Sequence, residues 1–149
     1  MTTLRYRPAL LFLPLLIFAS GCTELRLISE YDERTDQEVT GLQKRTGQLF
    51  SDLEKKLGTP GGDYGDFEAD YDSLMVDLRA LTVRAEARPK NDVQVTQLSN
   101  LREQLAQIAE RHRSGRLRGA EIEPARLITD QSFRVILRLE LAKKRGDEG

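Results

Sequence analysis

Four segments of this chain space their apolar residues alternately three and four positions apart, and this pattern limits the possible folds more than any other feature. The clearest example is the stripe formed by Tyr64, Phe67, Tyr71, Leu74, Leu78, Leu81 and Ala85. Residues at this spacing share one face of a helix, as in helices packed side by side in coiled coils. No alternation of period two persists along the chain, so the sequence does not predict strands.

The other three segments repeat the pattern with different apolar content. The third carries Leu98, Leu101, Leu105, Ile108 and His112. In the fourth we expect the buried stripe to comprise Ala125, Ile128, Ser132, Val135, Leu139 and Ala142, widened by Leu127, Ile136, Leu137 and Leu141. The first segment is more polar, and we expect its early turns to be packed less firmly; its heptad positions hold Ile28, Thr35, Leu42 and Leu49, and Val39, Thr46 and Leu53.

Short breaks separate these segments. A glycine-rich stretch at 58–62 ends the first, Pro89 ends the second, and a loop bracketed by Gly115 and Gly119 follows the third, with Pro124 in the first turn of the last helix. Short loops make consecutive helices antiparallel neighbours. We therefore predict an all-α fold, an antiparallel up-down-up-down four-helix bundle over residues 30–145, followed by a disordered tail at 146–149.

The N-terminal region has the layout of a secretory signal peptide. Arg5 and Arg7 precede an apolar run, which ends in small residues and then Cys22, the only cysteine. The apolar run is shorter than the roughly 20 residues that a membrane-spanning helix needs, and Pro14 interrupts it. A secreted protein with one free thiol is the alternative, but an unpaired cysteine is unusual in an oxidising compartment.

The sequence Ala19-Ser20-Gly21-Cys22 resembles the lipobox of bacterial lipoproteins. The resemblance implies removal of residues 1–21 and attachment of a diacylglycerol and an N-acyl lipid to Cys22. Residues 22–29 are then the lipid anchor and tether. Because Thr23 rather than Asp follows the cysteine, the resemblance also implies the periplasmic face of the outer membrane, or the cell surface in a host without one.

The composition of the remaining chain excludes several kinds of chemistry. It has no further cysteine, no tryptophan and a single histidine, which excludes disulfides, zinc sites of Cys and His, iron–sulfur clusters and cysteine nucleophiles. Ala109 stands where a di-iron Glu-x-x-His motif ending at His112 needs its glutamate, so we interpret His112 as a bundle-end residue with a satisfied ring. We expect no metal, no cofactor other than the lipid, no catalytic residues and hence no enzyme, and no nucleic-acid partner.

Charge is unevenly distributed although the formal net charge is −1. Residues 63–72 are rich in acids and residues 111–118 in bases, and the predicted topology places both at the end far from the membrane. They are either ordinary helix-end charges with cross-helix ion pairs or a docking surface for a charged partner. The candidate partner surface comprises Asp63, Asp66, Asp70, Arg111, Arg113, Arg116 and Arg118.

These observations favour a membrane-anchored envelope lipoprotein that acts as a non-enzymatic accessory or adaptor module, with an envelope protein as its partner and self-association possible. The basic residues 143–145 either match the dipole at the C-terminal end of the last helix, which the spacing favours, or face anionic lipid head groups. The alternative is a periplasmic chaperone-like or stress-response protein. Its basis is the segment Val39-Thr40-Gly41-Leu42-Gln43, which resembles the Leu-Thr-x-x-Gln motif of the Spy and CpxP type of stress chaperones.

Overall fold

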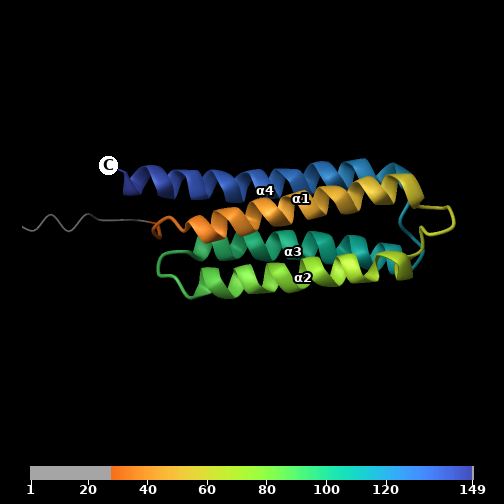
Figure 1. The fold of residues 1–149 in the computed structure, drawn as a ribbon, viewed down its shortest axis with the longest axis horizontal. Coiled ribbons are helices and arrows are strands. Elements are labelled where there is room, and N and C mark those ends of the chain that lie inside the picture. Colours follow the sequence, from red (N-terminus) through yellow and green to blue (C-terminus); the bar gives the residue numbers. More distant parts are fainter. Residues whose placement is uncertain (1–27, 149) are drawn as a thin grey trace, which may run out of the picture.

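A computed structural model describes residues 28–148, which form four helices joined by short loops (Figure 1). The helices are α1 (Glu33–Lys56), α2 (Tyr64–Glu86), α3 (Asp92–Arg113) and α4 (Gly119–Asp147). Each helix packs against the next one in the chain, and α4 also packs against α1, which closes the arrangement. The predicted up-down-up-down four-helix bundle is confirmed.

The bundle has two different ends (Figure 1). At the end that we call proximal, residues 28–32 enter α1, the loop 87–91 joins α2 to α3, and α4 terminates. At the opposite, distal end lie the loops 57–63 and 114–118. The predicted signal peptide and Cys22 lie outside the described residues.

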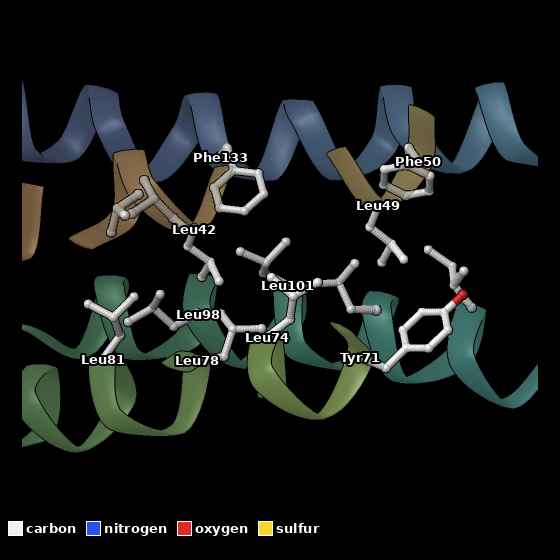
Figure 2. Close-up of a cluster of buried hydrophobic side chains, with 14 of the residues drawn as sticks. Leu42, Leu49, Phe50, Tyr71, Leu74, Leu78, Leu81, Leu98, Leu101 and Phe133 are labelled. Atoms are coloured by element: carbon white, nitrogen blue, oxygen red, sulfur yellow. The ribbon is translucent and has the colours of Figure 1, made fainter. Parts of the chain in front are cut away.

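The core runs along the whole bundle axis. Figure 2 shows leucine and aromatic side chains of the α1 and α4 pair pointing toward those of the α2 and α3 pair, with Leu42 and Phe133 facing Leu78 and Leu98. The stripes predicted for the first three helices are confirmed, because nearly all of their members are buried. The more polar α1 also buries Thr35 and Thr46, which are 3% and 1% exposed.

Helix α4 turns a face to the core that matches the predicted one only in part: Ile136 of the predicted set is buried, and Ala125 and Leu137 pack against the core. Its buried residues are Ile122, Thr129, Phe133, Ile136, Glu140 and Lys143. Of the stripe that we expected to be buried, Ile128 and Val135 are 55% and 41% exposed. The centre of the predicted face was wrong because we chose the most apolar stripe, whereas the buried face contains Glu140 and Lys143, two residues of opposite charge.

The ends of α4 also differ from the prediction. The helix begins at Gly119, so Pro124 lies inside it rather than in its first turn. Two contacts hold this early start: Ile122 is buried in the core, and Glu121 accepts a hydrogen bond from the backbone N–H of Arg118, with an N···O distance of 2.8 Å. At its other end α4 continues to Asp147, within the segment 146–149 that we expected to be a disordered tail.

Candidate functional site

The chain docks onto the proximal end of the bundle before α1 begins. The backbone N–H of Ser29 donates to the carbonyl oxygen of Lys90 (N···O 3.1 Å), and its hydroxyl donates to Oδ1 of Asn91 (2.8 Å). Two residues later, the N–H of Tyr31 donates to Oδ2 of Asp147 at the end of α4 (2.8 Å). Ser29, the last residue of the predicted tether, is therefore bound to the bundle.

Directly beneath this docked segment lies a buried polar cluster that the sequence analysis missed, formed by Asn91, Gln94, Glu140 and Lys143. The Nζ atom of Lys143 donates to oxygens of all three other residues, at 2.8 Å from Asn91, 2.5 Å from Gln94 and 2.6 Å from Glu140. Glu140 and Lys143 are 0% and 3% exposed. The cluster thus holds one positive and one negative charge inside the bundle.

A signal for this cluster exists in the sequence. Glu140 follows Phe133 by seven residues, and Lys143 follows Ile136 by seven. Residues seven apart lie on nearly the same face of a helix, so the two charged residues share the heptad phase of two core residues. The pattern is recognisable only once Phe133 and Ile136 are known to be buried.

A second polar network surrounds Asp32 at the same end. Its Oδ2 atom lies 3.3 Å from Arg84 in the last turn of α2 and 3.4 Å from Arg88 in the following loop, and it accepts a hydrogen bond from the Thr35 hydroxyl (2.8 Å). Partial burial opposes ionisation, but the Thr35 hydrogen bond and the two arginine charges outweigh it and hold the pKa of Asp32 below its usual range. The network ties the entry to α1 to the end of α2.

The basic residues at the C-terminal end of α4 have separate roles. Lys143 is buried and bound to Glu140, so the alternative in which it faces lipid head groups is wrong for this residue. Lys144 is exposed, with Nζ 5.5 Å from the ring centre of Tyr31. The Tyr31 hydroxyl donates a hydrogen bond to Asp36, and this bond raises the pKa of Tyr31 to about 12.

The residues of the candidate partner surface lie at the distal end of the bundle, but among the described residues its acidic members do not pair with its basic ones. Asp63 and Asp66 cap α2 reciprocally, and the Asp66 side chain accepts a hydrogen bond from the N–H of Asp63 (3.2 Å). Arg111 pairs with Glu121 of α4. Within residues 28–148, no ion pair joins the acidic group to the basic group.

The remaining distal charges stay open to solvent. Arg113 pairs with Glu110 of its own helix, and its guanidinium lies 5.8 Å from the ring centre of Tyr64. The hydrogen bond and charge of Arg113 lower the pKa of Glu110. The exposed side chains of Asp70, Arg116 and Arg118 make no ion pair in the described part of the chain.

His112 completes the distal end as part of the core. Its ring is 5% exposed and packs against the rings of Tyr64, Phe67 and Tyr71. The Nε2 atom lies 2.9 Å from the carbonyl oxygen of Gly62, and Nδ1 lies 3.3 Å from the hydroxyl oxygen of Tyr71. Both contacts are hydrogen bonds when Nε2 donates to the Gly62 carbonyl and Nδ1 accepts from the Tyr71 hydroxyl. The interpretation of His112 as a bundle-end residue with a satisfied ring agrees with this geometry.

Residues 28–148 contain no group of three or more His, Cys, Asp or Glu side chains placed to hold a metal ion. No helix in this range is both long and apolar enough to cross a membrane. Comparison with known proteins found no matching family model, no similar curated protein and no similar solved structure.

Proposed function

We propose that this protein is a membrane-anchored envelope lipoprotein that acts as a non-enzymatic accessory or adaptor binding module. One observation carries the proposal: the segment that follows the lipobox-like sequence is docked on the proximal end. Ser29 and Tyr31 are bound there by hydrogen bonds to Lys90, Asn91 and Asp147. An anchor upstream of Ser29 is therefore attached close to the folded bundle, without a long free linker between them.

Chain length sets the distance between this anchor and the bundle. Ser29 follows Cys22 by seven residues, and seven residues of extended chain span at most about 25 Å. Helix α3, with 22 residues, is about 33 Å long. A lipid on Cys22 keeps the proximal end near the bilayer and lets the distal end stand away from it.

The distal end is then the surface best placed to meet a second envelope component. Asp70, Arg116 and Arg118 are exposed there without ion pairs among the described residues. Exposed charges contribute mainly to steering and specificity of binding. Anchoring raises the local concentration of such a module near its target, so a modest affinity suffices.

The anchoring part of the proposal is tested by Cys22→Ser, with Thr23→Ser as the matched control. We expect the Cys22→Ser chain to accumulate as uncleaved precursor and to be lost from the detergent-soluble membrane fraction, whereas the control is processed normally. Mature Cys22→Ser protein of normal mobility that stays membrane-bound would refute acylation of this residue.

The adaptor part is tested by crosslinking in living cells with reversed distal charges. We expect the double variant Asp70→Lys, Arg116→Glu to capture the wild-type partner at least tenfold less well, since like charges then face each other. Lys44→Glu on the exposed side of α1 is the control and keeps capture. Undiminished capture by the folded double variant would overturn this part of the proposal.

The chaperone-like alternative is favoured by exposed apolar residues on α2. Val76 and Val83 are 66% and 55% exposed. Two members of the motif that suggested this alternative, Val39 and Leu42, are 0% exposed and serve the core. An aggregation assay decides between the two functions: suppression of several unrelated unfolding proteins at near-stoichiometric ratios would support the chaperone and reject the adaptor.

A further inference from the structure

The surface over α3 and α4 carries two parallel stripes without charge. On α4 the stripe consists of Ile128, Val135 and Ala142, and on α3 of Val93, Asn100 and Gln107. All six residues are exposed, with Ile128 at 55%, Val135 at 41% and Val93 at 57%. We call these six residues the α3/α4 face. Because 32% of the chain is charged, such an uncharged surface is unusual in this protein.

One hydrogen bond shows that both stripes lie on the same side of the bundle. The Ser132 hydroxyl donates to Oε1 of Gln104, at 3.0 Å, across the boundary between α4 and α3. Ile128 and Val135 lie four residues before and three residues after Ser132, and therefore border it on α4. Asn100 and Gln107 border Gln104 on α3 in the same way.

The two stripes are also in register. The contacts Ser132 with Gln104 and Lys143 with Gln94 fix the antiparallel alignment of the two helices. Because the helices are antiparallel, a residue seven positions later on α4 lies next to a residue seven positions earlier on α3. The residues that lie at about the same level are therefore Ile128 and Gln107, Val135 and Asn100, and Ala142 and Val93.

This register makes the α3/α4 face complementary to itself. A rotation of 180° about an axis parallel to the helices places α4 of one molecule opposite α3 of another. Each residue keeps its position along the bundle axis under this rotation. Val135 then meets Asn100 of the second molecule, and Ile128 meets its Gln107. A twofold interface of this kind uses the same surface patch on both molecules.

Charges at the two edges favour this arrangement over the antiparallel one. Arg134 and Arg138 lie beyond the stripe on α4, and Glu103 lies beyond the stripe on α3; none of them forms an ion pair within residues 28–148. The half-turn parallel to the helices brings the arginine edge of one molecule over the glutamate edge of the other. A half-turn perpendicular to the helices would place arginine over arginine, which is repulsive.

We propose that the α3/α4 face binds a second copy of this chain, with the two bundles parallel and their proximal ends on the same side. The inference does not depend on acylation of Cys22. The parallel arrangement does allow two anchors to enter one membrane, whereas an antiparallel pair would direct them apart.

The oligomeric state tests this proposal. The chain from Thr23 onward carries all four helices and no cysteine. In sedimentation velocity over a wide range of concentrations, we expect it to form a dimer. Val135→Glu and Ile128→Glu each bury a charge at the contact and should raise the dissociation constant at least about tenfold.

Val83→Glu is the matched control, because Val83 is 55% exposed and lies on α2, beside α1 and outside the α3/α4 face. It should leave the dimer intact, and circular dichroism should show that all three variants remain folded. A wild-type chain that stays monomeric at every concentration, or a dimer weakened equally by Val83→Glu, would overturn the proposal.

The orientation is tested by mixing two single-cysteine chains, Asn100→Cys and Val135→Cys, under mild oxidation. Disulfides require Cα atoms within about 7 Å of each other. The parallel arrangement predicts mixed disulfides between the two chains. Disulfide dimers of Val135→Cys alone, without mixed species, would indicate α4 packed on α4 and would refute the parallel arrangement.

Discussion

The Nζ atom of Lys143 lies 2.6 Å from Oε1 of Glu140, one turn back on α4, and both side chains are enclosed by the bundle. Removing two charges from water costs several kcal/mol per ion, and their attraction offsets this cost only when further hydrogen bonds satisfy the ammonium group. Asn91 and Gln94 supply those hydrogen bonds from the start of α3. The pair therefore joins the buried face of α4 to the start of α3.

Removing one member of this pair should destabilise the protein more than replacing both. Lys143→Met leaves the Glu140 carboxylate buried without a counter-charge, and we expect it to lower the free energy of unfolding by about 3–5 kcal/mol. The double variant Glu140→Leu, Lys143→Met should lose clearly less. Urea unfolding midpoints at constant m-value measure both effects. The prediction would be contradicted if the double variant lost as much unfolding free energy as the single variants Lys143→Met and Glu140→Leu lose together.

The sequence predicted the faces of α1, α2 and α3 because each has one dominant apolar stripe. On α4 two stripes have the same spacing, and the more apolar one, with Ile128 and Val135, is exposed. The buried stripe contains Glu140 and Lys143, whose burial depends on Asn91 and Gln94 of another helix. Spacing within one helix carries no information about such partners, so the face of α4 was not predictable from it.

The two stripes of α4 should respond oppositely to truncation. Phe133→Ala leaves a cavity in the core and should cost about 3–5 kcal/mol of stability. Val135→Ala, two residues away on the exposed stripe, should change stability by less than about 0.5 kcal/mol. Thermal and urea unfolding of the two variants, measured at a concentration where the wild-type chain is monomeric, gives the comparison. Equal losses of unfolding free energy in the two variants would contradict the buried face described here and would support burial of Val135.

The distal candidate surface was predictable only in part. Antiparallel topology correctly places the acidic start of α2 and the basic end of α3 at one end of the bundle. The ion-pair partner of Arg111 was missed, because Glu121 becomes its neighbour only when α4 begins at Gly119. The early helix start depends on the packing of Ile122, which local propensity does not describe.

Asp32 should give the protein a dependence of stability on acidic pH. Its pKa is lowered from the ordinary value of 3.8 in the folded state. The folded state therefore binds its proton less readily than the unfolded state, and the stabilisation is complete above the unfolded pKa and lost as pH falls through the folded pKa. We expect Asp32→Asn to cost about 1 kcal/mol at neutral pH and progressively less below roughly pH 4.

Urea unfolding of wild type and Asp32→Asn at a series of pH values measures this difference. Asp72→Asn, an exposed residue without an ion pair in the described part of the chain, is the control and should show no such trend. A cost of Asp32→Asn that stays constant down to strongly acidic pH would show that its charge does not contribute.

Gly62 should be the glycine least tolerant of substitution at the distal end. A β-carbon added at Gly62 would lie 1.9 Å from the carbonyl oxygen of Lys56, a backbone atom that cannot move without shifting the end of α1. The carbonyl oxygen of Gly62 also accepts the hydrogen bond from His112. We expect Gly62→Ala to lower the free energy of unfolding by about 3 kcal/mol. Gly65→Ala, three residues on in α2 with no atom within 4 Å of an added β-carbon, should instead raise it by about 0.5 kcal/mol. Similar effects of the two variants in urea unfolding would show that the loop 57–63 can yield at Gly62.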